Sequence, residues 1–194
     1  MMLLKNIASK AAYTAIIPSI LCYNVASKAI GRELAFQGIS EKAALWTGLW
    51  GILKRRALYS SILPKVGNKL TVSFGSLFSR VDIEIGSKVY IGWYCSLGNV
   101  CIGDDVMIAD YVSIPSGARQ HGFSRLDIPM RAQNGEYQKI NIGNNCWIGS
   151  GAIVLADVGN HSIIGAGSIV TKPVQDYAIV SGNPARVTGD RRDT

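Results

Sequence analysis

Aliphatic residues return at intervals of six along two stretches of this chain, 85–114 and 142–170, with one shortened interval in each. A period of six does not keep one face on a helix of 3.6 residues per turn. Eight of the twelve aliphatic positions are followed by glycine, which is disfavoured inside helices and strands. The twelve positions are Ile85, Ile91, Leu97, Ile102, Ile108, Ile114, Ile142, Ile148, Val154, Val158, Ile164 and Val170.

This pattern predicts a parallel β-helix, in which each six-residue unit is a short strand plus a corner and three units close one triangular coil. We expect the aliphatic residue to point inward, together with a small or apolar residue four positions later. Glycine is expected to supply a tight or positive-φ corner. Each coil can bury its interior only against its neighbours, so the array should fold as one stack. The second inward positions are Val89, Cys95, Val106, Val112, Cys146, Ala152, Ser162 and Ser168.

Three runs narrow the family within residues 75–187. They are Cys146-Trp147-Ile148-Gly149-Ser150-Gly151, Ile164-Gly165-Ala166-Gly167-Ser168-Ile169-Val170-Thr171-Lys172 and Gly182-Asn183-Pro184-Ala185-Arg186-Val187. The chain resembles the hexapeptide-repeat acyltransferases, in the O-acetyltransferase branch that includes galactoside, maltose, streptogramin and polysaccharide acetyltransferases. This resemblance implies an all-β, left-handed parallel β-helix, a homotrimer, and an acetyl-CoA site in the groove between neighbouring subunits.

The N-terminal third of the chain differs from the repeats in charge and pattern. Residues 1–66 hold nine Lys or Arg against two Glu, whereas residues 67–194 hold eleven of each sign. Apolar residues at helical spacing predict one helix within 1–30 and another over 41–59, whose basic run at 54–56 would suit its last turn. We therefore predict an α-helical segment over 1–66, a β-helix domain over 67–187 with a protruding loop at 115–139, and a C-terminal tail over 188–194.

The apolar stretch 1–30 is interrupted by Pro18 and several polar residues, which argues against a membrane span of about 20 apolar residues. A cleaved signal peptide would not suit acetyl-CoA chemistry in the cytosol. Two alternatives remain open for this stretch. It is either a helix packed on the β-helix or a neighbouring subunit, or an amphipathic helix lying on an anionic membrane surface. We expect a cytoplasmic protein, peripheral on the inner membrane in the second case.

Neither cysteine nor histidine spacing predicts a metal site. The four cysteines, at positions 22, 95, 101 and 146, lack CxxC or metal-ligand spacing, and a buried apolar role is expected. The two histidines fall short of the three that hold zinc in the γ-carbonic anhydrases, which share the β-helix fold. Binding to nucleic acid is not expected, because no basic motif is interleaved with stacking aromatic residues.

Acetyl transfer to a sugar hydroxyl requires a general base, donors for the developing oxyanion and a slot for the thioester. His121 lies in the predicted loop, where the resemblance places the catalytic histidine, and its side chain titrates near neutral pH. We predict that His121 is the base, and that Asp110 or Asp127 orients its ring. The second histidine, His161, falls at a corner and is expected to be simply exposed to solvent.

The resemblance also implies which residues bind the substrates. Contacts with acetyl-CoA fall on Trp147, Ser150, Ala166, Thr171, Lys172 and Arg186. The backbone N–H near Ser150 would donate to the thioester carbonyl, and the two cations would meet the CoA phosphates. Asp110 and Tyr111 are predicted to bind the saccharide acceptor, although many sugar acetyltransferases carry Asn in place of Tyr111. The run 156–158 is two residues shorter than the pattern of the family and lacks its Pro-Gly.

The sequence therefore predicts an acetyl-CoA-dependent O-acetyltransferase that acts on a sugar hydroxyl in surface polysaccharide biosynthesis. An antibiotic acetyltransferase of the streptogramin type and an amino-sugar N-acetyltransferase share these core motifs and remain alternatives. A non-catalytic β-helix adaptor, held at a membrane by residues 1–66, is an alternative from a different functional class.

Overall fold

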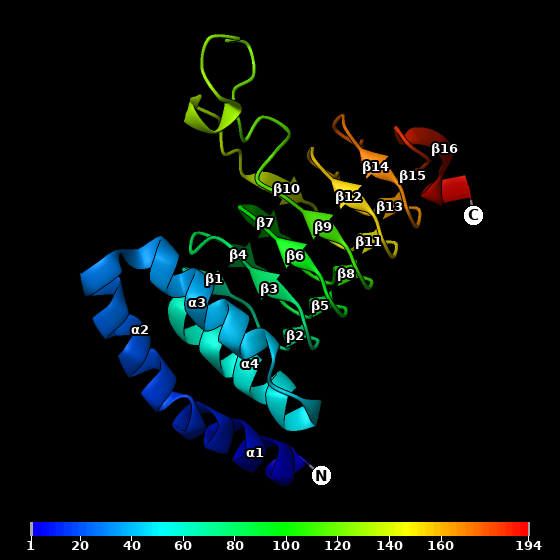
Figure 1. Cartoon of the computed structure of the whole chain (residues 1–194). Coiled ribbons are helices and arrows are strands. Elements are labelled where there is room, and N and C mark those ends of the chain that lie inside the picture. The colour runs from blue at the N-terminus through cyan, green and yellow to red at the C-terminus, as the bar shows by residue number, and fades with distance from the viewer. Residues whose placement is uncertain (1, 194) are drawn as a thin grey trace.

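A computed structural model describes residues 2–193 of the chain, and side chains from residue 7 onward (Figure 1). Four helices form a layer at one end of a stack of short strands. They are α1 (Met2–Ala15), α2 (Ile17–Ile30), α3 (Arg32–Ala44) and α4 (Gly48–Ile62). None of these described helices combines the length and the apolar composition that crossing a membrane requires.

The strands form three sheets, the three faces of the predicted prism, and every pairing is parallel except that of β15 with β16. Sheet A contains β1 (Lys65–Val66), β4 (Glu84–Ile85), β7 (Val100–Ile102) and β10 (Ile140–Ile142). Sheet B contains β2 (Thr71–Val72), β5 (Tyr90–Ile91), β8 (Met107–Ile108), β11 (Trp147–Ile148), β13 (Ile163–Ile164), β15 (Ala178–Ser181) and β16 (Arg186–Asp190). Sheet C contains β3 (Leu77–Phe78), β6 (Ser96–Leu97), β9 (Ser113–Ile114), β12 (Ile153–Val154) and β14 (Ile169–Val170).

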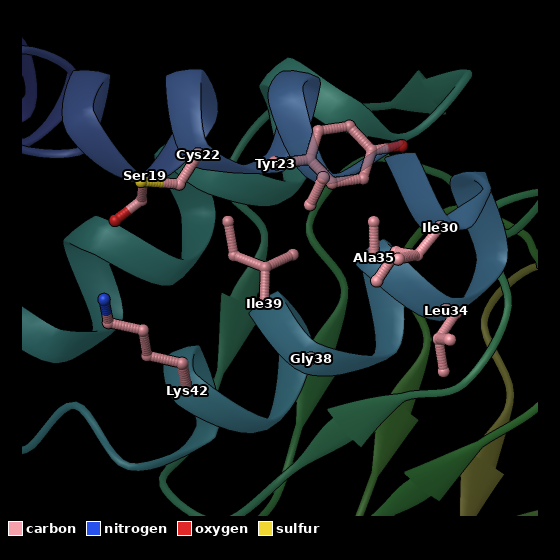
Figure 2. Close-up of a pocket in the computed structure, with 10 residues that line it drawn as sticks. Ser19, Cys22, Tyr23, Ile30, Leu34, Ala35, Gly38, Ile39 and Lys42 are labelled. Atoms are coloured by element: carbon pink, nitrogen blue, oxygen red, sulfur yellow. The ribbon is translucent and has the colours of Figure 1, made fainter. Parts of the chain in front are cut away.

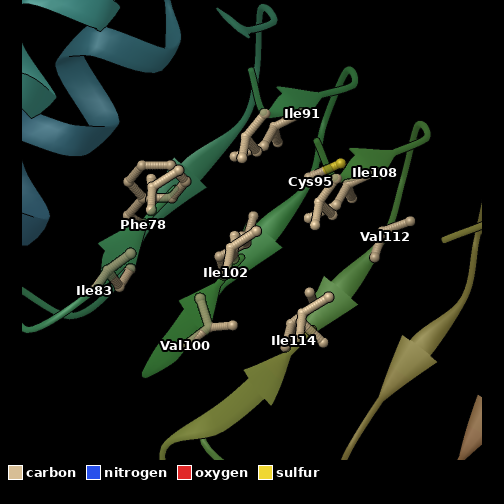
Figure 3. Close-up of a cluster of buried hydrophobic side chains, with 14 of the residues drawn as sticks. Phe78, Ile83, Ile91, Cys95, Val100, Ile102, Ile108, Val112 and Ile114 are labelled. Carbon is tan, nitrogen blue, oxygen red and sulfur yellow. The ribbon is translucent and has the colours of Figure 1, made fainter. Parts of the chain in front are cut away.

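The interior of the stack is filled as the six-residue period predicts. All twelve aliphatic positions are at most 2% exposed, and so are the eight second inward positions. Figure 3 shows such side chains, among them Ile91, Cys95 and Ile108, directed between the strands. The coils begin earlier than the clear repeat, because β1, β2 and β3 already pair with the next coil. Their partly or fully buried Val66, Val72 and Phe78 also step by six.

The repeating glycines have a different role from the one expected. None of the eight has a positive φ; instead the residue two positions later adopts it, for example Lys88 after Gly86, with φ 58°. A Cβ atom on Gly86 would lie 2.5 Å from Oδ1 of Asp104 in the next coil. That oxygen accepts a 2.6 Å hydrogen bond from the N–H of Ser87. The glycine is therefore needed for close approach between coils rather than for an unusual backbone angle.

The single helix predicted over 41–59 is wrong, because the chain breaks at 45–47 between α3 and α4. A Cβ atom on Gly51 would lie 2.3 Å from the carbonyl oxygen of Trp46, so the turn folds tightly against α4. The basic run lies within α4 rather than in its last turn. Its central residue, Arg55, is 1% exposed and donates to the carbonyls of Val72 and Ala43. Buried backbone carbonyls need donors, and this requirement outweighs the helix dipole here.

Candidate functional site

The segment 115–139 leaves the stack after β9 and returns at β10 as a projecting loop (Figure 1), with one short helix, η1 (Met130–Ala132). Its base is closed by a 3.0 Å hydrogen bond from the N–H of Gln138 to the carbonyl of Ser116. At the same end, Nζ of Lys139 lies 2.8 Å from Oε1 of Glu84 on β4. The loop is thus anchored at its base, and its outer residues are exposed.

His121 lies in this loop beside a shallow cavity of about 290 Å³, lined also by Arg119, Phe123 and Glu136. Its side chain is exposed, and it has no hydrogen-bond partner within residues 7–193. Close contact between the two arms of the loop fixes the backbone here, since a Cβ on Gly135 would meet the carbonyl oxygen of Gln120 at 1.9 Å. A base in this position could reach a reactant brought to the outside of the stack.

Neither predicted orienting carboxylate contacts His121 in the structure. Asp127 accepts hydrogen bonds from Arg125, 3.0 Å from its Nε, and this contact lowers the pKa of Asp127. Oδ1 of Asp110 accepts a 2.8 Å hydrogen bond from the N–H of Trp93, so this carboxylate supports a corner of the stack. Both are used locally, because each lies within reach of a nearer donor.

Three of the predicted acetyl-CoA contacts converge on one cavity near the C-terminal end of the stack. Thr171, Lys172 and Arg186 line this cavity of about 290 Å³ together with Pro173 and Val187. Thr171 also borders a second cavity that includes Arg119 and Lys139, at the base of the loop. The cavity therefore places two cations near the arm that carries His121.

The other predicted site residues lie along the corner between sheets B and C. The N–H of Gly151 donates to the carbonyl of Asp110, and that of Gly167 donates to the carbonyl of Ser150, at 2.9 and 2.8 Å. These bonds place Asp110, Ser150 and Ala166 in successive coils, and Trp147 is 49% exposed on β11 just before them. Sheet C separates this corner from the loop and the cation cavity. Among the described residues, no hydrogen bond joins His121 to this corner.

An exposed aromatic cluster lies on the same corner. The rings of Tyr94 and Tyr111 stack with centroids 5.5 Å apart and an interplanar angle of 10°, and the neighbouring Trp93 is 57% exposed. Both tyrosines have positive φ, 55° and 60°, at a position that Gly151 and Gly167 fill in later coils. Sequence reasoning missed Trp93 and Tyr94, although an aromatic residue in the corner position was the available signal.

His161 has a structural position rather than a free one. Its Nδ1 lies 3.1 Å from Nδ2 of Asn145, and its ring stacks on Tyr177 with centroids 4.8 Å apart. Being half-buried, it is less exposed than expected.

The cysteines and the metal prediction have mixed outcomes. Cys95 and Cys146 are buried, which raises the pKa of both thiols, whereas Cys22 is exposed and Cys101 half-buried, contrary to expectation. Within the described part of the chain, no three His, Cys, Asp or Glu side chains are grouped so that they could hold a metal ion.

The sequence matches the family model of the bacterial transferase hexapeptide (six repeats) over residues 139–172. No curated protein matches the chain by sequence. Among solved structures, the chain is similar to a galactoside acetyltransferase in complex with coenzyme A, with 29% identity and a TM-score of 0.70 over 81% of this chain and 80% of the other.

Two further structures show the same fold. A maltose O-acetyltransferase from Clostridium difficile 630 has 24% identity and a TM-score of 0.71, covering 81% of this chain and 87% of its own. A hexapeptide-repeat acetyltransferase from Vibrio cholerae has 20% identity and a TM-score of 0.70, covering 81% and 92%. Together with the family model, these structures confirm the left-handed β-helix of hexapeptide repeats and the resemblance to the hexapeptide-repeat acyltransferases.

Proposed function

We propose that this chain is an acetyl-CoA-dependent O-acetyltransferase that acetylates a sugar hydroxyl, in surface polysaccharide biosynthesis. The observation that carries the proposal is the similarity to a coenzyme A-bound galactoside acetyltransferase over about four fifths of both chains. The cavity that joins Lys172 and Arg186 supports it, because two exposed cations at one rim suit the phosphates of CoA.

In the proposed reaction His121 is the general base. It takes the proton of the acceptor hydroxyl as the hydroxyl oxygen attacks the thioester carbonyl carbon. The backbone N–H near Ser150 donates to the oxygen that becomes negative. When the C–S bond breaks, the acetyl group stays on the sugar oxygen, and the thiolate of CoA receives the proton from His121.

The separation of the site residues within one chain supports a homotrimer. His121 projects from the loop at one edge of sheet C, while Trp147, Ser150 and Ala166 follow the opposite edge. A neighbouring copy would bring its loop to the edge that carries Trp147 and so complete the groove. In this arrangement the acetyl-CoA contacts are Trp147, Ser150, Ala166, Thr171, Lys172 and Arg186.

The acceptor is proposed to bind at Asp110 and Tyr111. One oxygen of Asp110 accepts from Trp93, and the other has no partner within residues 7–193, so it is free to accept a hydrogen bond from a sugar hydroxyl. Tyr111 is 63% exposed and presents a ring face to solvent. An apolar ring face suits the C–H face of a sugar, and a hydroxyl at its end suits a polar acceptor.

Release of free CoA thiol from acetyl-CoA, measured with a panel of neutral sugars, amino sugars and a streptogramin, tests the activity. We expect turnover with a neutral sugar or its oligomer. Turnover only with amino sugars would indicate N-acetylation, and turnover only with the streptogramin would indicate an antibiotic-modifying enzyme.

Calorimetric binding of acetyl-CoA tests the cofactor site. We expect Lys172→Ala to weaken binding by about tenfold or more, because a hydrogen bond to a charged group is lost. The matched variant Lys88→Ala, whose ammonium pairs with Asp105 elsewhere on the stack, should bind as the wild type does. If the wild type binds no acetyl-CoA, the proposal fails and a non-catalytic adaptor becomes the better reading.

A further inference from the structure

The outer face of α2 exposes an apolar stripe. Ile17, Leu21 and Val25 are spaced by four residues, so they lie on one side of the helix, and they are 50%, 60% and 70% exposed. Tyr23, on the opposite side, is 8% exposed and belongs to the core. The helix therefore packs through one face and leaves the other uncovered. Exposed apolar patches of this kind mark interaction surfaces.

A groove between α2 and α3 adjoins the stripe (Figure 2). It encloses about 250 Å³, and its walls are mostly apolar. In Figure 2, Ser19 and Lys42 lie at one end of the groove, and Ile30 and Leu34 lie at the other. Ile30 and Leu34 are also more than half exposed, at 55% and 58%, which extends the apolar surface onto α3. An apolar groove with an ammonium at one end suits an acyl chain below an anionic headgroup.

The charges around this surface are mainly positive. The basic side chains of the first three helices, from residue 7 onward, are all exposed: Lys10, Lys28, Arg32 and Lys42. Of the two acids there, Glu33 turns toward the β-helix, where its carboxylate accepts a hydrogen bond of 3.3 Å from the N–H of Val81. It also lies 3.9 Å from Arg80. Glu41 alone remains an exposed acid in this part of the described chain.

The positive charge of α4 is not available in the same way. Arg55 and Arg56 donate to backbone carbonyls of the first coil, and the ammonium of Lys54 lies 4.0 Å from the ring centroid of Trp46. The charge excess of the N-terminal third thus has two separate roles. The α4 cations hold the helices on the stack, and those of the first three helices face solvent beside the apolar stripe.

We propose that the α2 stripe and the α2–α3 groove dock this protein on an anionic lipid bilayer. The axis of α2 lies in the plane of the interface, with its apolar side chains at the acyl boundary and Lys10, Lys28, Arg32 and Lys42 among the headgroups. A second copy of the chain fits this face less well, because it would bring like charges together. The inference does not depend on the proposed activity.

Vesicle flotation tests the docking surface. The wild type should bind vesicles that contain phosphatidylglycerol but not vesicles of phosphatidylcholine alone, and added salt should weaken the binding. Leu21→Glu should lower the partition coefficient about tenfold or more, since it removes a buried Leu side chain from the bilayer. The same substitution at Leu126, which is 98% exposed on the loop, is the matched control and should bind normally.

A wild type that does not bind anionic vesicles would overturn the proposal, and so would equal binding by the wild type and Leu21→Glu. Light scattering on the same variants covers the alternative occupant. If Leu21→Glu leaves vesicle binding unchanged and reduces the mass of the oligomer, a second copy covers the stripe and the proposal is wrong.

A label on Cys22 gives a measurement that leaves the stripe intact. Cys22 lines the groove and is exposed, whereas Cys95 and Cys146 are buried. In a Cys101→Ser background, a polarity-sensitive fluorophore on Cys22 should shift its emission to the blue with phosphatidylglycerol vesicles only. An unchanged spectrum would contradict insertion of this face.

Discussion

Arg55 and Val72 are joined by a 2.8 Å hydrogen bond from Nε of the guanidinium to the main-chain carbonyl, which fastens α4 to the first coil of the β-helix. The same guanidinium donates from Nη1 to the carbonyls of Ala43 and Trp46 at the end of α3. One buried side chain therefore satisfies carbonyls from β2, from α3 and from the turn before α4. The helical layer and the stack are linked by a polar contact inside an otherwise apolar interface.

Arg55→Met should destabilise the protein, because it keeps much of the side-chain volume while leaving buried carbonyls without donors. We expect the free energy of unfolding to fall by about 2–4 kcal/mol, as each unsatisfied buried acceptor costs roughly 1–3 kcal/mol. Urea unfolding measures the change. Arg32→Met is the matched control, since Arg32 is exposed, and its effect should stay within about 0.5 kcal/mol. Equal midpoints for the two variants would reject this role of Arg55.

Two glycine substitutions should have opposite signs. A Cβ on Gly143 would lie 2.6 Å from the backbone nitrogen of Asn160 in the next coil, so Gly143→Ala should cost about 1–3 kcal/mol through overpacking. Gly38, within α3, has no atom within 4 Å of an added Cβ, and Gly38→Ala should stabilise by about 0.5–1 kcal/mol. Thermal unfolding of both variants decides the matter. A neutral Gly143→Ala would contradict the account of the repeating glycines.

The inward half of the β-helix could be predicted because the interior imposes its period directly on the sequence. Each of the aliphatic positions must be buried, and no other regular structure repeats every six residues. The role of the glycines could not be predicted in the same way. It depends on which side chain of the next coil lies above each glycine, such as Asp104 above Gly86, and the loop at 115–139 makes that pairing unreadable from spacing alone.

The candidate site was predicted as a set of residues but not as an arrangement. Thr171, Lys172 and Arg186 do share a cavity, although 15 residues separate Thr171 from Arg186 in the sequence. The partner of His121 could not be found, because no carboxylate of the described chain contacts it. The turn at 45–47 was missed for a similar reason. It is set by the contact of Gly51 with Trp46, and apolar spacing carries no sign of that contact.

The two histidines form a natural pair for testing the proposed mechanism. His121→Ala should lower turnover by about 10²–10⁴-fold, the usual contribution of a general base. Acetyl-CoA binding, oligomer size and stability should stay as in the wild type, because the ring is exposed and makes no hydrogen bond within residues 7–193. Thiol release from acetyl-CoA and urea unfolding measure these quantities. Full activity in this variant would remove His121 from the reaction.

His161→Ala should show the reverse behaviour. It loses the ring stacked on Tyr177 and the contact with Asn145, so the free energy of unfolding should fall by about 0.5–1.5 kcal/mol. Turnover per folded molecule should not change, because this corner holds none of the proposed site residues. A large loss of turnover here, with stability unchanged, would show that the roles of the two histidines have been exchanged.

The ion pair between Lys139 and Glu84 makes the base of the loop sensitive to pH. Lys139 lowers the pKa of the Glu84 carboxyl, chiefly through their hydrogen bond. A carboxyl whose pKa is lowered by folding stabilises the folded state above its unfolded pKa, about 4.3, and loses this contribution as the pH falls through its folded pKa. Both side chains are 35% exposed, so solvent screening limits the contribution to about 0.5 kcal/mol.

Such a small contribution is best detected locally, in the backbone of the loop that Lys139 ends. Hydrogen exchange at 116–138, taken relative to intrinsic rates, should accelerate in the wild type only below the pKa of Glu84. Glu84→Gln should show the faster exchange already at neutral pH. Asp105→Asn breaks a comparable exposed pair with Lys88 on another part of the stack, and it should leave the loop unchanged. If wild type and Glu84→Gln exchange alike at neutral pH, the loop is held by its backbone bonds and by Tyr137, whose ring lies 4.3 Å from the guanidinium of Arg80.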